Sequence, residues 1–281
     1  MPDVNADQSK HWNEVVGPRW VALGDQMDVW LEEISTHVLR LAAAKPGEAV
    51  LEIGSGTGSM GVRLARAVAP GGHVLGIDIS RPMIEAAEAR LRREGLGNLA
   101  FQLADAQVHP FPRAAFDLAF SRFGVMFFER PAAAFANVRT AMKPGGRLAF
   151  VCWGPLARNV HWSVPFGIVV RHLGRPNPRP PHAPGPMAFD EPDYVRGLLD
   201  EAGWRAIAIA ETEIEGGGES LEQAVDHALT IGPASGLITE RNAPPETVAR
   251  IRDELRAEFA RYEQGGVVRL PGQIFLVSAR A

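Results

Sequence analysis

A glycine-rich segment, Val50–Gly58, constrains this chain more than any other part of its sequence. The apolar run Val50–Ile53 predicts a short buried β-strand. Three glycines then follow at alternate positions, and they allow the backbone to turn sharply and to approach a ligand without a Cβ in the way. We expect a helix over about 58–69, with Thr57 or Ser59 as its cap. A strand, a glycine-rich turn and a helix in this order predict a loop that binds a nucleotide-type cofactor.

The spacing of the glycines separates the possible classes of loop. A dinucleotide-binding loop has the pattern G-x-G-x-x-G, and its third glycine helps to seat a pyrophosphate. Gly54 and Gly56 fit that pattern, but Ser59 stands at the third position and Gly58 comes one residue early. This displacement argues against a pyrophosphate ligand. A Walker phosphate loop is excluded because no Gly-Lys-Ser/Thr follows.

The composition narrows the class of protein. The 281 residues are 46% hydrophobic and 22% charged, as is typical of a globular protein with a sizeable core. The net charge of -4 and the lack of a long basic run argue against nucleic acid as a partner. No stretch approaches the ~18–20 apolar residues of a membrane span. The first ten residues lack an apolar signal region, and Cys152 is the only cysteine, so we expect a cytoplasmic protein without an intrachain disulfide.

Strands and helices alternate along most of the chain, which predicts a parallel α/β sheet with right-handed crossovers. We expect strands at 49–53, 73–78, 99–103, 116–121, 147–153, 204–211 and 273–279, and helices at 58–69, 81–94, 131–142, 191–202, 220–231 and 245–263. Before them come a polar leader at 1–20 and an amphipathic helix at roughly 25–43. The proline-rich residues 154–189 predict a long, ordered and functional loop with a short helix at 162–173.

Two acidic residues stand at the ends of successive predicted strands. Asp78 ends the second strand, where a carboxylate can accept hydrogen bonds from the ribose of a nicotinamide or an adenosyl cofactor alike. Asp105 ends the third strand, where a carboxylate can accept from the exocyclic amine of adenine. With the glycine loop they form three ligand groups at the carboxyl edge of the sheet, where open α/β folds bind ligands.

With these residues the sequence resembles the class I S-adenosylmethionine-dependent methyltransferases. It looks most like their small-molecule branch, which includes the ubiquinone and menaquinone C-methyltransferases. Each matching segment is weak alone, but five occur in order and at the family's spacing, within about residues 45–155. They are Val50–Gly58, Gly76–Ser80, Leu103–Ala106, Phe116–Ser121 and Lys143–Leu148.

The resemblance implies a Rossmann-like α/β fold with helical cap elements. Its sheet would have seven strands in the order 3-2-1-4-5-7-6, with the last strand antiparallel. The chain would then divide into an N-terminal helical cap segment (1–44), an S-adenosylmethionine-binding core (45–153), a proline-rich loop or cap (154–190) and a C-terminal part of the core (191–281). A helical insertion at 216–264 would interrupt the last part.

The resemblance also implies S-adenosyl-L-methionine as the cofactor and indicates which residues hold it. They would surround its methionine and ribose parts, accept from its ribose hydroxyls, and meet the face and the edge of its adenine. In that order, the expected residues are Gly54, Ser55, Gly56, Gly58 and Ser121, then Asp78, then Ile79 and Met83, and finally Asp105 and Ala106. For Met83, packing in the core is an equal alternative.

The methyl group of a sulfonium is already activated, so its transfer needs positioning and desolvation more than an acid or a base. The apolar run after the fourth strand favours a small apolar or aromatic acceptor, and it lacks the Asn-Pro-Pro-Tyr-like motif of methyltransferases that act on planar nitrogen. Arg122 would pair with an acidic group of the substrate or, more often in such a context, with a neighbouring acid. The expected substrate-binding residues are Trp12, Trp20, Arg122, Phe123 and Met126.

Three histidines in the expected cap, His11, His161 and His182, are candidates for a general base, although each is more often an ordinary surface or packed residue. Their spacing is not that of metal ligands, so no metal is expected. An NAD(P)-dependent oxidoreductase and a non-enzymatic S-adenosylmethionine-binding protein are the alternative functions. The atom that is methylated (C, O, N or S) and the oligomeric state stay open.

Overall fold

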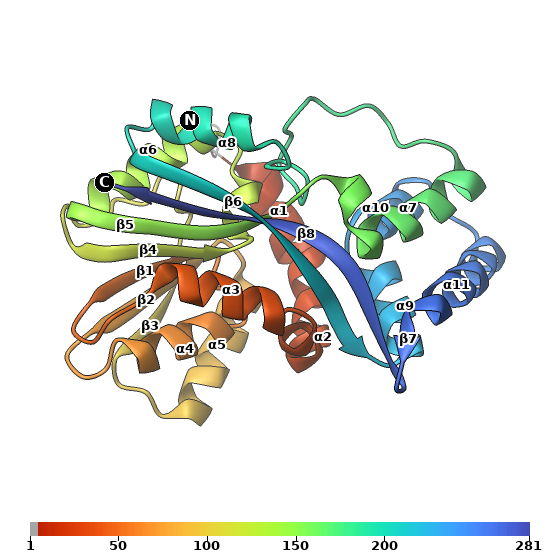
Figure 1. Ribbon diagram of the computed structural model, residues 1–281, viewed down its shortest axis with the longest axis horizontal. Helices are drawn as coiled ribbons and strands as arrows, with labels where there is room; N and C mark the ends of the chain where they lie inside the picture. Colours follow the sequence, from red (N-terminus) through yellow and green to blue (C-terminus); the bar gives the residue numbers. More distant parts are fainter. Residues whose placement is uncertain (1–4) are drawn as a thin grey trace.

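One twisted sheet organises the computed structural model, which describes residues 5–281 (Figure 1). Its strands lie in the order β3-β2-β1-β4-β5-β8-β6, and a short β7 pairs with β8. The neighbours from β3 to β5 are parallel, whereas β8 runs antiparallel to both β5 and β6. The predicted strand order is therefore confirmed, with β8 in the place of the seventh strand. The strands are β1 (Ala49–Ile53), β2 (His73–Asp78), β3 (Leu99–Leu103), β4 (Phe116–Arg122), β5 (Met142–Trp153), β6 (Arg205–Glu219), β7 (Glu263–Gln264) and β8 (Val267–Arg280).

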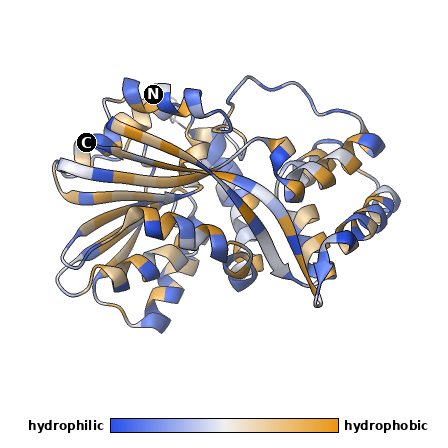
Figure 2. Ribbon diagram, in the orientation of Figure 1, coloured by the Kyte–Doolittle hydropathy of each residue, from blue (hydrophilic) through white to orange (hydrophobic). Residues whose placement is uncertain are grey.

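Helices cover both faces of this sheet. On one face lie α3 (Glu32–Ala42), α4 (Ser59–Ala67) and α5 (Arg81–Glu94), and on the other lie α6 (Pro131–Ala141) and α8 (Pro192–Glu201). Because β1 is buried along its whole length, it can consist of continuous apolar residues rather than alternating ones. Figure 2 shows the apolar residues along these strands, while the covering helices carry hydrophilic residues as well.

A second lobe consists of helices. It contains α7 (Val160–Leu173), α9 (Leu221–Thr230), α10 (Pro233–Glu240) and α11 (Pro245–Phe259), which lie together at one end of the molecule (Figure 1). These helices enclose a hydrophobic cluster of their own, with Val169, Val225, Ile251, Leu255 and Phe259 fully buried. The long strands β6 and β8 run from the sheet into this lobe and connect the two.

The predicted C-terminal strands are too short. The strand expected at 204–211 continues to Glu219, and the one expected at 273–279 begins at Val267, because the two pair with each other beyond the main sheet. The helical part of the expected insertion therefore starts at Leu221 rather than at 216. Three consecutive glycines, 216–218, hide the strand extension from β propensity. Helix α10 was not predicted, whereas α7, α8, α9 and α11 lie where helices were expected.

The helices predicted near the N-terminus were wrong in number and position, although the segment is helical as expected. In place of a polar leader and one helix at 25–43, the chain forms α1 (Ala6–Glu14), α2 (Val16–Trp30) and α3. Helix α1 buries none of its residues, so it has no apolar stripe to reveal it, and α2 is kinked at Gly24 (φ 43°, ψ -119°). Residues 1–4 of the expected cap segment lie outside the described residues. No helix in residues 5–281 combines the length and apolar character needed to traverse a bilayer.

Candidate active site

The glycine loop leaves β1 at Ile53 and turns with left-handed backbone at each of its glycines. The φ angles of Gly54, Gly56 and Gly58 are 68°, 53° and 84°, values that favour glycine because it has no Cβ. Gly58 itself is the residue before α4, so the predicted side-chain cap is absent from this described helix end. A Cβ on Gly54 would lie 2.7 Å from the Cα of Gly124, whereas a Cβ on Gly56 would meet no described atom within 4 Å. The backbone at Gly56 therefore faces open space.

Asp78 binds this loop from the neighbouring strand. Its Oδ2 accepts a hydrogen bond from the backbone N–H of Gly56 at 2.9 Å, and its Oδ1 accepts from that of Ser80 at 2.9 Å. Burial raises the pKa of the Asp78 carboxyl, and the backbone donors act in the opposite direction. The glycine loop and the acid at the end of β2 are thus in direct contact.

The other expected cofactor residues lie along the same edge. Ser121 ties the ends of β4 and β1 together, since its Oγ donates to the carbonyl of Ile53 at 2.8 Å and accepts from the N–H of Gly124 at 3.1 Å. Asp105 follows β3 and accepts from the N–H of Gln107 at 2.9 Å. Ile79 is half-buried, while Ala106 and Met83 are buried. That these residues bind the cofactor stays a prediction.

Helix α1 lies across this edge. The carbonyl of Trp12 accepts from Ser80 Oγ at 2.9 Å, and the side chain of Asn13 donates to the carbonyl of Ile79 at 3.1 Å. At the other end, the amide of Asn5 donates to Asp105 Oδ2 at 3.3 Å. Sequence reasoning missed Asn5 and Asn13, because a polar helix without an apolar stripe gives no signal.

Several buried polar atoms around this edge have no hydrogen-bond partner within the described residues. They belong to α1, to the end of β1 and to the loop after β3, and they are Asn5 Oδ1, Gln8 Oε1, Glu52 Oε2, Ser55 Oγ and Gln107 Nε2. Buried polar groups are nearly always hydrogen-bonded in folded proteins. A cluster of exceptions at one strand edge indicates a site for a polar ligand.

Sequence reasoning also missed Glu52, although an acid inside the apolar run of β1 is a signal that could have found it. It is 1% exposed, and its pKa is raised to about 8 by burial and by Asp78, with the charge of Arg122 opposing this shift. Arg122 is held by the chain's own residues: it donates to Ser35 Oγ at 2.8 Å and lies 3.6 Å from Asp28. The internal ion pair, which was the alternative for Arg122, is therefore present.

The residues that are expected to bind the substrate begin where β4 ends. Phe123 has a left-handed backbone (φ 67°) and stacks on Trp153, with ring centroids 4.3 Å apart. Met126 is 1% exposed, and its carbonyl accepts from Gly185 of the proline-rich loop. Trp12 and Trp20 lie on another side: Trp12 packs edge-on against Phe127 and also contacts Trp20. Trp12 therefore packs at the C-terminal end of the short 3-10 helix that follows Phe123, and whether these residues bind the substrate stays a prediction.

The three candidate histidines lie apart. His161 is buried beside Trp153, with ring centroids 4.6 Å apart. His11 is exposed on α1, and partial burial together with Arg179 and Arg19 lowers its pKa. His182 stacks on the ring of Tyr194.

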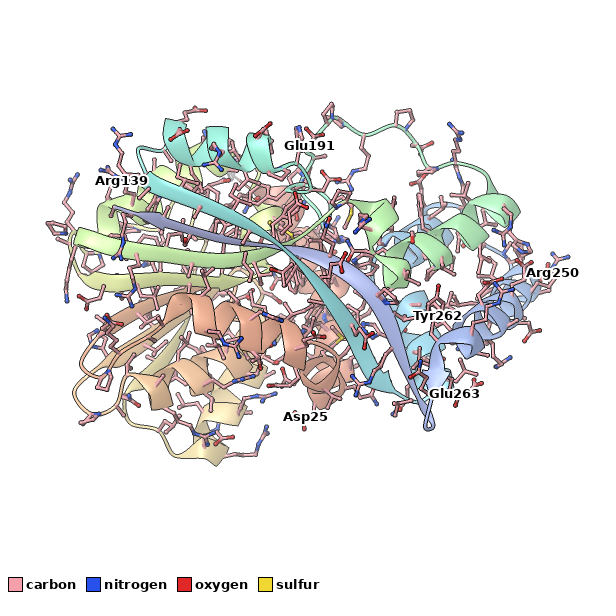
Figure 3. All side chains as sticks on the ribbon, in the orientation of Figure 1. Asp25, Arg139, Glu191, Arg250, Tyr262 and Glu263 are labelled. Carbon is pink, nitrogen blue, oxygen red and sulfur yellow. The ribbon has the colours of Figure 1, made fainter. Side chains whose placement is uncertain are left out.

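His182 also lies near two acids at the start of α8. Its ring and the carboxyl groups of Asp190 and Glu191 come within 4.8 Å of one another, at a position that Figure 3 marks by Glu191. Acidic groups on protein surfaces commonly gather in this way without a metal. Only His161 of the three therefore lies in an enclosed site.

Comparison with known proteins agrees with this geometry. Residues 50–146 match the model of a family described as a methyltransferase domain. Nocamycin O-methyltransferase of Saccharothrix syringae is 25% identical over 255 residues, which cover 88% of this chain and 90% of that protein. The ubiquinone/menaquinone biosynthesis C-methyltransferase UbiE of Shewanella frigidimarina is 33% identical over 113 residues, which cover 40% of this chain and 45% of that protein. The chain thus aligns with less than half of the UbiE sequence.

The fold has solved relatives as well. A structure described as an S-adenosylmethionine-dependent methyltransferase from Aquifex aeolicus superposes with a TM-score of 0.53 at 22% identity, covering 71% of this chain and 92% of the other. The strand order and this superposition show a Rossmann-like fold. The chain carries a methyltransferase domain at residues 50–146, in agreement with the S-adenosylmethionine-dependent methyltransferase that its motifs predicted.

The buried acid of β1 predicts a pH-dependent stability. Folded Glu52 holds its proton up to about pH 8, whereas its ordinary pKa is 4.5. The folded state binds this proton more tightly, so the stabilisation is complete below pH 4.5, declines as the pH rises and is lost above about 8. We expect the free energy of unfolding to fall by roughly 1 kcal/mol per pH unit across this window.

Glu52→Gln keeps the shape of the side chain and removes the titration. Urea denaturation at pH 5, 6, 7 and 8 should give a nearly flat profile for the variant and a falling profile for the native protein. Glu213→Gln, at an 82% exposed side chain, is the matched control and should follow the native protein. Parallel profiles for native protein and Glu52→Gln would contradict the assignment.

Proposed function

We propose that this enzyme transfers the methyl group of S-adenosylmethionine to a small apolar or aromatic acceptor bound between the glycine loop and the helical lobe. One observation carries the proposal. The loop after β4 touches the glycine loop at Gly124 and, one residue earlier, places Phe123 on the ring of Trp153. Two consecutive residues, Phe123 and Gly124, therefore connect the aromatic pair with the predicted cofactor site.

The residues at the strand edge fit the cofactor. Open space above Gly56, the unpartnered Ser55 Oγ and the carboxylate of Asp78 offer room, a donor and an acceptor to a polar ligand. We assign Gly54, Gly58 and Ser121 to its methionine side. At the adenine side we place Ile79, Met83, Asp105 and Ala106. When bound, the cofactor supplies a methyl group on a positively charged sulfur, which a nucleophile attacks in line.

The chain's own elements position the reactants and exclude water. Helix α1 closes over the strand edge through Trp12 and Asn13, so that a ligand below it is shielded from solvent. Holding two reactants in line in a desolvated site accounts for much of the rate of such a transfer. We propose that residues 1–44 and the helical insertion after β6 act as the two caps of the site.

The relatives support an acceptor of this kind. Nocamycin O-methyltransferase and UbiE are named for the methylation of small molecules, at oxygen in the first and at carbon in the second. A hydrophobic wall that includes Phe123, Met126 and Trp153 suits an apolar or aromatic compound better than a charged one.

Asp78→Ala should lower the affinity for S-adenosylhomocysteine by about tenfold or more, because hydrogen bonds to a charged carboxylate are lost. Isothermal titration calorimetry measures this effect, and Asp78→Asn tests the charge with less change in shape. Asp25→Ala, at an 89% exposed carboxyl on the outside of α2 (Figure 3), is the control. Unchanged affinity in a folded Asp78→Ala would contradict the assignment of Asp78.

Gly56→Val should abolish cofactor binding while the protein still folds, because the new side chain extends into the open space that the cofactor would fill. The left-handed φ of 53° costs about 1–2 kcal/mol for a residue with a Cβ. Gly145→Val is the matched control, since Gly145 also has a positive φ (76°) and open space around it, at the turn before the main part of β5. Both variants should lose similar stability, but only Gly56→Val should lose S-adenosylhomocysteine; binding by Gly56→Val would refute the placement.

A further inference from the structure

A buried aromatic chamber lies between the sheet and the helical lobe. Its walls come from α2, the end of β5, α7 and α9, and its members are Trp30, Trp153, His161, Trp162 and His227. The ring of His161 is enclosed by the three tryptophans, with centroid distances of 4.6 Å to Trp153, 4.7 Å to Trp162 and 4.9 Å to Trp30. We call this group the aromatic chamber.

The chamber contains polar atoms that the chain does not satisfy. His161 is 4% exposed and Trp162 is 6% exposed, yet neither ring nitrogen of His161 nor the indole Nε1 of Trp162 has a partner within residues 5–281. A hydroxyl group can donate to an imidazole nitrogen and accept from an indole N–H, so it supplies partners for two of these three atoms.

A second histidine and an acid stand next to this ring. His227 of α9 lies edge-on to Trp30, and its Nδ1 is 3.4 Å from Oε2 of Glu219 at the end of β6. Both residues are 6% exposed. Burial, followed by the charge of His227, holds the pKa of His161 well below its ordinary value, so His161 is neutral and one of its ring nitrogens can accept a hydrogen bond.

We propose that the acceptor is a planar, uncharged hydroxyl compound, a phenol or an enol, and that His161 takes its proton in the aromatic chamber. His161 is then a catalytic residue, while Glu219 is a positioning residue whose carboxylate, held beside His227, favours the imidazolium. This inference rests on the proposed methyl transfer and specifies its acceptor. The described residues that line the hollow include no lysine or arginine, which argues against an acceptor that carries a free carboxylate or phosphate.

The electron and proton balance of this step closes within the site. The hydroxyl oxygen forms a bond to the methyl carbon, the bond from that carbon to sulfur breaks, and the sulfur keeps the electron pair. The hydroxyl proton moves to a ring nitrogen of His161. The positive charge thereby passes from sulfur to the imidazolium, near the carboxylate of Glu219, and the proton later leaves to solvent.

The chamber adjoins the predicted cofactor loop. Trp153 is shared between His161 and Phe123, and Gly124 after Phe123 contacts Gly54. The hollow among the lining side chains has room for about one water molecule. An acceptor therefore enters as the surrounding side chains and helices shift, which is a common step in enzymes that close over a substrate.

The first test measures binding without turnover. The full-length protein is labelled with ¹⁵N-histidine, saturated with S-adenosylhomocysteine and titrated with 4-nitrophenol, 4-methylphenol, thiophenol and aniline. We expect the phenols to quench tryptophan fluorescence and to shift the His161 resonances, which are assigned with His161→Phe. Phenols that leave His161 unmoved overturn the inference. If S-adenosylhomocysteine itself does not bind, the proposed function fails instead.

The second test separates a base from a packing residue. His161→Phe keeps an aromatic ring in the chamber and should lower kcat/KM for 4-methylphenol by about 100-fold or more. The loss should be much smaller for 4-nitrophenol, which ionises by itself near neutral pH, and it should shrink for both phenols as the pH rises. Glu219→Gln should lower kcat/KM about tenfold and shift its pH profile.

The same binding and activity measurements are made on a control variant. Arg250→Gln, at the outer end of α11 (Figure 3), should leave activity and binding unchanged, and every variant should retain its affinity for S-adenosylhomocysteine. An equal loss for both phenols at all pH values would show a packing role and overturn the assignment of His161. Methylation of thiophenol or aniline in preference to every phenol would overturn the acceptor class while leaving methyl transfer in place.

Discussion

The contact between two backbone loops organises both halves of this enzyme. Gly54 and Gly124 approach so closely that neither position has room for a Cβ, and Ser121 Oγ bridges the two strand ends by hydrogen-bonding to Ile53 and Gly124. Because of this contact, the loop that leaves β1 and the loop that leaves β4 share one wall. The residues that we assign to the cofactor line one side of that wall, and the aromatic residues that begin at Phe123 lie beyond the other. We propose that backbone packing, and not flexible side chains, sets the distance between the two reactants.

Buried charge surrounds the same contact. Glu52 is the last residue but one of β1, and Asp78 is the last residue of β2. Burial raises the pKa of both carboxyl groups. The two acids are treated differently: Asp78 receives backbone N–H groups from Gly56 and Ser80, while Oε2 of Glu52 lacks a partner in the part of the chain that the structure describes. A positively charged ligand near these carboxyl groups would offset the cost of burying them, because an opposite charge favours the ionised form.

The sequence predicted the local pattern at the cofactor edge and missed what depends on distant contacts. The strand, turn and helix at 49–67 follow from apolar residues and glycines that are neighbours in the chain, and the strand order followed from the family resemblance. Helix α1 was not predicted because it buries no apolar stripe. The extension of β6 was not predicted because residues 216–218 are glycines, which are kept extended only by pairing with β8. His227 had no motif around it, since its partners Glu219 and Trp30 come from other elements of the fold.

This division between local and long-range signals corresponds to a division of roles in the molecule. The residues that we assign to the cofactor lie on the loops of one continuous sheet, where short connections fix their positions. The aromatic chamber instead takes Trp30 from α2, His161 and Trp162 from α7, and His227 from α9. The long strand β6 leads directly into α9, and both β6 and β8 contact this helix. We therefore expect substitutions in the helical lobe to alter the acceptor more than the glycine loop, because the chamber reaches that loop through Trp153, Phe123 and Gly124. With such an architecture, we expect a sequence motif for the cofactor and none for the acceptor.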